Sequence, residues 1–175
     1  MRINEPLTFE NVIDQYQTQV FRTVLGMIGN YHDAEDLSQD IFVKLYRKLD
    51  SFKGHSSFKT WLYVIVHNTV KNYLLKNKLR RMISLDWLTD ETDFEIPSDA
   101  LSAQEETETK ETIQELNCAL QKIPFQHRHV LVLREINELA YDEIATILNC
   151  SIGTVKSRLS RAKENLRRSY ENAKS

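Results

Sequence analysis

Apolar residues recur at helical spacing over three segments in the N-terminal half of the chain. The first segment, residues 9–28, is followed by Gly29 and Asn30, which typically end a helix. The second starts at Asp33 and carries a leucine and isoleucine stripe at i, i+4, with acids in its first turns and bases in its last, as the helix dipole favours. The third spans residues 58–78. The pattern therefore predicts three helices, with a loop over residues 53–57.

The C-terminal part predicts four more helices in about 60 residues. The last two are short and joined by a tight turn: residues 141–148, a break over 149–151 in which Ser151 suits an N-cap, and a strongly basic helix with a narrow apolar stripe. The opposite face of that helix carries Lys156, Ser157, Ser160, Arg161 and Lys163. Turn, cap and charge together favour a helix-turn-helix that enters the major groove of DNA over a hairpin with a solvated basic face.

Residues 82–110 differ from both halves because acids, Ser, Thr and Pro97 dominate them, which is a linker composition. Fully extended, this stretch reaches on the order of 100 Å, whereas two groove sites two helical turns apart on DNA are separated by roughly 70 Å. We therefore predict an all-α protein with two small helical domains joined by a flexible acidic linker. The predicted boundaries are 1–81, 82–110 and 111–175.

The charge of the chain is strongly segregated although its net value is only −2. Residues 44–81 hold ten Lys or Arg and one acid, residues 86–115 hold eleven acids and one base, and residues 153–175 hold seven bases and two acids. Two basic blocks flanking an acidic one indicate nucleic-acid partners. The apolar run 61–66 is too short to span a bilayer, and the N-terminus lacks a signal-peptide core, so we expect a cytoplasmic protein without membrane insertion.

The sequence predicts no metal site and no cofactor. Cys118 and Cys150 match no ligand spacing, and the five histidines do not group with them. We expect both cysteines to be small buried residues. An enzyme acting on nucleic acid would need clustered carboxylates or a metal beside the basic surface. The acids lie instead in one helix and the linker, so we expect no catalytic activity.

Three segments taken together carry a resemblance to a known family: residues 33–46, residues 52–74 and the helix-turn-helix at 139–163. In this order and at this length the chain resembles the extracytoplasmic-function (ECF) sigma factors, which are promoter-specificity subunits of bacterial RNA polymerase. The resemblance implies a transcription initiation factor that binds core RNA polymerase, recognises −35 and −10 promoter elements and assists melting. It also implies control by an anti-sigma factor and no small-molecule substrate.

The resemblance also implies residue roles. The second predicted helix would dock on core polymerase through Asp36, Gln39, Asp40, Phe42 and Lys44. The loop and third helix would read the melted −10 strand through Lys53, His55, Ser56, Ser57, Phe58, Lys59, Asn68, Lys71 and Asn72. The C-terminal domain would read the −35 duplex through Arg134, Tyr141, Asp142, Thr154, Lys156, Ser157, Arg158, Ser160 and Arg161.

Several alternatives stay open from the residues alone. The acids of the second helix also stabilise a solvated first turn, and Trp61 suits core packing as well as stacking. The acidic linker fits either an RNA mimic in a nucleic-acid channel or a solvated tether. A stand-alone helix-turn-helix regulator would bind duplex DNA tightly without polymerase, and a nuclease would require a divalent metal.

Overall fold

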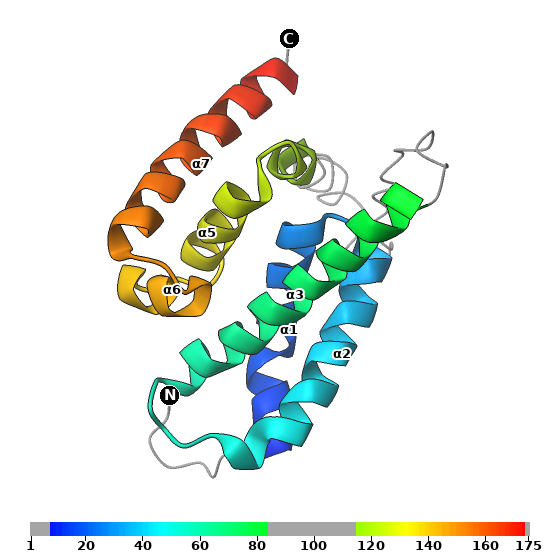
Figure 1. Cartoon of the computed structure of the whole chain (residues 1–175), viewed down its shortest axis with the longest axis vertical. Helices are drawn as coiled ribbons and strands as arrows, with labels where there is room; N and C mark the ends of the chain where they lie inside the picture. The colour runs from blue at the N-terminus through cyan, green and yellow to red at the C-terminus, as the bar shows by residue number, and fades with distance from the viewer. Residues whose placement is uncertain (1–7, 84–114, 174–175) are drawn as a thin grey trace, which may run out of the picture.

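The computed structural model describes residues 8–83 and 115–173, and its regular elements in these ranges are all helical (Figure 1). The N-terminal unit (residues 8–83) and the C-terminal unit (residues 115–173) each hold a set of packed helices. The elements are α1 (Phe9–Ile28), α2 (Tyr31–Lys48), the short 3-10 helix η1 (Leu49–Ser51), α3 (Phe58–Ile83), helical residues 115–121, α5 (Phe125–Glu135), α6 (Tyr141–Leu148) and α7 (Ile152–Ala173).

The predicted break between the first two helices is confirmed at Gly29 and Asn30. Gly29 has φ +80°, and its N–H donates to the Leu25 carbonyl at 2.8 Å, which closes α1. The side-chain oxygen of Asn30 accepts from the Asp33 N–H at 2.9 Å and caps α2. Because Asn30 is the cap, α2 starts at Tyr31, two residues before the predicted start.

The N-terminal unit buries the predicted apolar stripes of α1, α2 and α3 between the three helices. Val20, Met27, Ile41 and Leu45 are fully buried in this core. At one end an aromatic cluster joins α1, the loop after η1 and the start of α3, and its members are Tyr16, Phe52, Phe58 and Trp61. This cluster anchors the loop that leads into α3.

The C-terminal unit has the predicted helix-turn-helix. Asn149 takes up the left-handed conformation (φ 48°) and ends α6. Ser151 then caps α7, because its side-chain oxygen accepts from the Thr154 N–H at 3.1 Å. Ile144, Val155 and Leu159 are buried between the two helices and α5. The turn and the cap are therefore where the sequence predicts them.

The two units pack directly on each other, α1 against α5 and α3 against α6 (Figure 1). Their buried apolar residues form one continuous cluster across the contact. At Gly26 an added Cβ would lie 3.2 Å from Val132 Cγ2 and 3.3 Å from Ile136 Cδ1. A side chain at this point would therefore require Val132 and Ile136 to move by a few tenths of an ångström.

The predicted linker lies outside the described residues, except that residues 82 and 83 continue α3. Among the described helices, none combines the length and apolar character that a membrane span requires. Cys150 is half-buried, but Cys118 is exposed, so the prediction that both cysteines are buried was wrong for Cys118. The helical residues 115–121 turn that side chain away from the core.

Candidate polymerase and nucleic-acid interfaces

The exposed face of α2 carries acids next to large apolar side chains. Asp36, Gln39 and Asp40 are exposed, and i, i+4 spacing places the two carboxylates on the same face. Val43 and Tyr46 continue this face with exposures of 49% and 64%. Helical periodicity alone places Val43 and Tyr46 outside the buried stripe of Leu37, Ile41 and Leu45, but it does not mark them as functional.

Phe42 and Gln39 also line a shallow apolar groove between α1 and α2, with a volume of 530 Å³. Ile13 and Phe21 of α1 form its opposite side. Lys44 lies elsewhere, because its ammonium turns toward α3 and stands 3.4 Å from Thr69 Oγ1. Of the five residues predicted to contact polymerase, four border one continuous surface of acids and apolar groups, and Lys44 borders α3.

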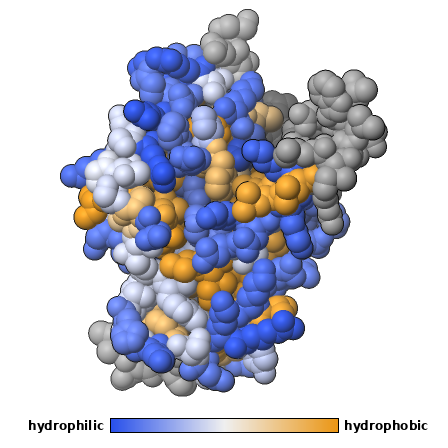
Figure 2. Space-filling view, in the orientation of Figure 1, coloured by the Kyte–Doolittle hydropathy of each residue, from blue (hydrophilic) through white to orange (hydrophobic). Residues whose placement is uncertain are grey.

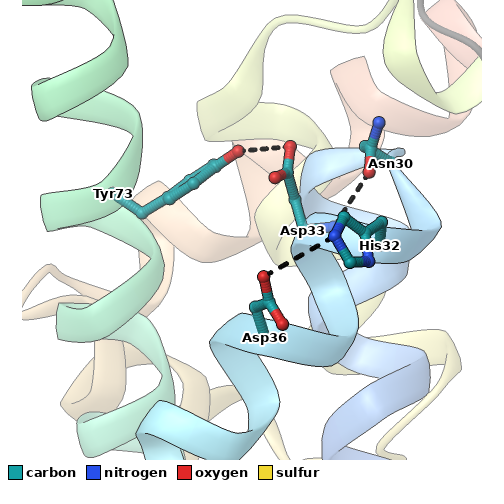
Figure 3. Close-up of polar contacts among 5 residues, drawn as sticks. All are labelled: Asn30, His32, Asp33, Asp36 and Tyr73. Carbon is teal, nitrogen blue, oxygen red and sulfur yellow. Dashed lines mark hydrogen bonds and ion pairs between the residues drawn. The ribbon is translucent and has the colours of Figure 1, made fainter.

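The start of α2 is fixed to α3 by a strong hydrogen bond (Figure 3). The Tyr73 hydroxyl donates to Asp33 Oδ2 at 2.6 Å, within the short range of hydrogen bonds to carboxylates. His32 Nε2 lies 4.0 Å from Asp36 Oδ2 with both side chains largely exposed, so this pair contributes little to stability. The Tyr73–Asp33 bond therefore joins the start of α2 to α3, next to the acidic face of α2.

The loop before α3 presents polar side chains to solvent. Lys53, His55, Ser56 and Ser57 are exposed. Gly54 has φ +73°, and a side-chain carbon added there would meet no atom within 4 Å. Farther along α3, three more of the predicted DNA-binding side chains are exposed: Asn68, Lys71 and Asn72.

Phe58, a predicted DNA contact, and Trp61, which suits stacking as well as core packing, are both packed in the aromatic cluster. Phe58 is only 5% exposed, with its ring centroid 5.5 Å from that of Phe52 and 5.7 Å from that of Tyr16. Trp61 is half-buried against Phe52 and Phe58. In this arrangement the Phe58 ring holds the loop in place and offers no free face for a base. Burial was not evident from sequence because an aromatic residue suits both roles.

The outer face of α7 is exposed and basic. Lys156, Ser157, Ser160 and Arg161 all project from this face. Thr154 is half-buried and takes part in the cap at Ser151. At the start of α6, Asp142 is exposed. These residues form one side of the helix-turn-helix.

Arg134 and Arg158 point away from that basic face. The Arg134 guanidinium donates to the Leu139 carbonyl at 2.7 Å and lies 5.3 Å from the centre of the Tyr141 ring. It thereby holds the turn between α5 and α6. Arg158 lines a cleft of 830 Å³ between α3 and the C-terminal unit.

This cleft is basic and partly apolar. Lys71, Lys78, His127 and Arg158 line it together with Leu75, which is 51% exposed. Figure 2 shows the apolar surface over α3 near its C-terminal end, among hydrophilic side chains. The cleft is not visible in the sequence because its two walls come from segments more than 40 residues apart in the chain.

Two histidines stack at the bottom of the cleft, His67 of α3 and His129 of α5, with their ring centroids 4.8 Å apart and Nδ1 atoms 3.4 Å apart. The pKa of His129 is lowered to about 3, mainly by burial and in addition by the charges of His67, Arg128 and Arg158. The pKa of His67 is also lowered, by burial and by Lys71. Within the described residues, no three His, Cys, Asp or Glu side chains come close enough to hold a metal ion.

Comparisons with known proteins match both halves of this arrangement. The family model described as Sigma-70 region 2 matches residues 12–80, and that described as Sigma-70, region 4 matches residues 113–166. The RNA polymerase sigma-H factor of Pseudomonas aeruginosa is 34% identical over 160 residues, which cover 89% of this chain and 82% of that protein. The chain belongs to the ECF family of bacterial RNA polymerase sigma factors.

Other proteins similar to this sigma factor are also RNA polymerase sigma factors. The ECF RNA polymerase sigma-E factor of Escherichia coli strain K12 is 38% identical over 160 residues, covering 89% of this chain and 83% of that protein. The RNA polymerase sigma factor YlaC of Bacillus subtilis is 36% identical over 164 residues, covering 92% and 91%. Like the rest of its family, this sigma factor is a transcription initiation factor for RNA polymerase.

The solved structure of the sigma factor RpoE in complex with the anti-sigma factor NepR from Bartonella quintana superimposes with a TM-score of 0.78 at 26% identity. The match covers 93% of this chain and 96% of RpoE, so it includes both units. CnrH in complex with the cytosolic domain of CnrY shares the fold, with a TM-score of 0.64 at 21% identity over 95% and 89% of the two chains.

Proposed function

We propose that this sigma factor binds core RNA polymerase through the face of α2 formed by Asp36, Gln39, Asp40, Val43 and Tyr46. The observation that carries the proposal is the exposure of two large apolar side chains beside two carboxylates. Exposed apolar groups supply affinity on burial, and the carboxylates select a basic partner surface. A solvated helix end that only stabilises itself would not need Val43 and Tyr46 at the surface.

The two units then divide promoter recognition. The unit predicted to span residues 1–81 reads the melted −10 strand with the loop at 53–57 and the exposed polar face of α3. The unit predicted to span residues 111–175 reads the −35 duplex with Lys156, Ser157, Ser160 and Arg161. Residues 82–110 connect them. Arg134 supports this function by holding the turn before α6, and Arg158 contributes positive charge to the cleft.

An anti-sigma factor would bind at the cleft between α3 and the C-terminal unit. RpoE of Bartonella quintana, which matches over both units, is bound by the anti-sigma factor NepR. In this chain the cleft beside α3 combines basic groups with exposed leucine, which suits a partner segment that is acidic and apolar. The protein acts by binding alone, without a reaction of its own, in the cytoplasm where polymerase and promoter DNA are found.

The first test is a pull-down of purified bacterial core RNA polymerase with the full chain. We expect stoichiometric binding by the wild type and loss of binding by Asp40→Arg, because the new guanidinium would repel a basic partner surface. Asp50→Arg, at an exposed site in η1, is the matched control and should bind as the wild type does. Tight binding to duplex DNA together with no binding to polymerase would favour a stand-alone regulator instead.

A further inference from the structure

One large apolar side chain lies exposed on the helix-turn-helix. Ile152 is the first residue of α7, and 45% of it is exposed. The other large apolar side chains that the structure describes in α6 and α7 are buried or half-buried, and Ile144, Val155 and Leu159 are examples. Ile152 therefore differs from every apolar neighbour in these two helices.

The stability of the helix-turn-helix does not explain this residue. The side chain of Ser151 already caps α7, and Val155 and Leu159 supply the buried face of the following turns. Isoleucine has a lower helix propensity than many polar residues, and the first turn of a helix favours acids. The first turn of α7 nevertheless holds no acid. Within the fold, nothing favours isoleucine over a polar residue at position 152.

The place of Ile152 in α7 is that of a residue that meets base edges. In a helix-turn-helix, residues near the N-terminus of the second helix contact bases in the major groove. Helical spacing of four and eight residues places Ile152 on the same side of α7 as Lys156 and Ser160. Both are exposed and belong to the surface proposed to read the −35 duplex. Ile152 extends this surface by one turn.

The surroundings of Ile152 suit DNA better than a protein partner. Protein partners bind contiguous apolar patches, whereas both chain neighbours of Ile152, Ser151 and Gly153, are exposed and not apolar in this sense. The hollow beside Ile152 includes the polar side chains of Asp142 and Thr146. A carbon added at Gly153 would meet only Ser151 Oγ, at 3.7 Å. Packing therefore does not require this glycine, and its small size lets the start of α7 come close to a ligand.

Thymine is the base that an apolar side chain selects in the major groove. It is the only one of the four bases whose edge carries an apolar group there, the C5 methyl. The side chain of isoleucine has no hydrogen-bonding group, so it would remove water from the polar edges of the other bases without replacing it. Burial of one methyl group favours binding by about 0.8 kcal/mol, which is about fourfold.

We propose that Ile152 is a specificity-determining residue of −35 recognition, which contacts the C5 methyl group of a thymine in the major groove beside the base pair that Lys156 contacts. This inference rests on the proposed function of α7. The thymine lies on either strand, because both strands present their bases in the same groove. The contact also accepts 5-methylcytosine, whose methyl group is attached at the same ring position, and it does not favour cytosine or uracil.

The first arm of the test identifies the base. The full chain bound to core RNA polymerase selects from duplexes of random sequence, and the enriched duplexes are sequenced. We expect the wild type to select a thymine at one −35 position where Ile152→Ser has no preference for it. Leu116→Ser is the matched control, because Leu116 is 42% exposed in the same unit but outside the helix-turn-helix. An identical −35 element for the wild type and Ile152→Ser would overturn the inference.

The second arm removes only the methyl group. In the selected duplex the thymine is replaced by deoxyuridine, and binding by the complex of the full chain with core polymerase is measured by competition. We expect binding by the wild type to weaken about fourfold and binding by Ile152→Ser to stay the same. With cytosine at this position, 5-methylation should strengthen binding by the wild type alone. Equal binding of the thymine and deoxyuridine duplexes by the wild type would contradict the contact.

The two ideas fail in different ways. A wild-type complex that selects a −35 element but does not distinguish thymine from deoxyuridine overturns the role of Ile152 and leaves the proposed function intact. A wild-type chain that does not bind polymerase, or whose complex with polymerase enriches no sequence, overturns the proposed function and the inference that rests on it.

Discussion

Lys59 Nζ donates a hydrogen bond of 2.6 Å to the carbonyl oxygen of Asn137, 78 residues away in the chain. Lys59 is one of the residues from which a phosphate contact is expected, and here its charge is directed at the other unit. In the structure the backbone of Asn137 is therefore the partner of Lys59, and a DNA phosphate would have to replace it.

The salt dependence of DNA binding tests the expected contact between Lys59 and a DNA phosphate. We expect Lys59→Ala to make the negative slope of log K, the association constant for single-stranded DNA, against log salt less steep by about 0.7. One phosphate contact and its released counterion are lost in this variant. Lys122→Ala removes an exposed charge outside both proposed DNA surfaces and serves as the control. An unchanged slope, measured by fluorescence anisotropy over a salt series, would show that Lys59 does not contact phosphate.

The stacked pair of His67 and His129 makes stability depend on pH. Burial, together with neighbouring positive charges, lowers the pKa of His129 from 6.5 to about 3, so the folded form binds fewer protons than the unfolded form between these values. The contribution of neutral His129 to the free energy of unfolding is therefore fully present above pH 6.5, and it is lost as the pH falls from 6.5 toward 3. The loss from His129 alone is about 1.4 kcal/mol at pH 5.5. Lys71, Arg128 and Arg158 all disfavour protonation of the pair.

We expect His129→Leu to remove most of this pH dependence. The substitution also removes His129 Nε2, a buried atom without a hydrogen-bond partner, so stability near pH 7.5 should be retained or increased. Urea unfolding at about pH 7.5 and about pH 5.5 measures the difference. His55→Asn, at an exposed loop position, should leave the wild-type pH dependence intact; equal pH dependence in the wild type and His129→Leu would contradict the assignment.

The turn of the helix-turn-helix depends on the left-handed backbone of Asn149, which has φ 48°. We expect Asn149→Ala to destabilise the protein by about 1 kcal/mol and Asn149→Gly to cost less, because alanine resists this conformation and glycine does not. Thermal unfolding monitored by circular dichroism measures both. If alanine and glycine behaved alike, the strain would have to be relieved by a rearranged turn.

A substitution at an exposed apolar residue of α2 tests whether polymerase binding and DNA binding use different surfaces. Val43→Asp should weaken core polymerase binding by at least about tenfold, since a single buried anchor in an interface accounts for about 1–2 kcal/mol or more. Binding of duplex DNA by α7 should not change, because Val43 lies in the other unit. A pull-down and a DNA-binding titration on the same variant check both parts, and a parallel loss of DNA binding would indicate misfolding instead.

The sequence by itself determined the order of the helices, the break at Gly29 and Asn30, and the helix-turn-helix with its Ser151 cap. Gly29, Asn30 and Ser151 act through hydrogen bonds to residues only three or four positions away, so their roles are visible in the local pattern. The buried stripe of Leu37, Ile41 and Leu45 likewise follows from helical periodicity alone. The family resemblance rests on the same local segments.

The tertiary structure alone decided which of the candidate residues are free to bind. Phe58 is taken into the aromatic cluster, Arg134 into the turn before α6, and Lys59 into the contact with Asn137. Nothing local distinguishes these side chains from exposed ones of the same type, because their partners lie elsewhere in the chain. The packing of the two units is likewise set by the close approach of α1 and α5 at Gly26 and by buried hydrogen bonds at Asn137, and neither is encoded in periodicity or charge.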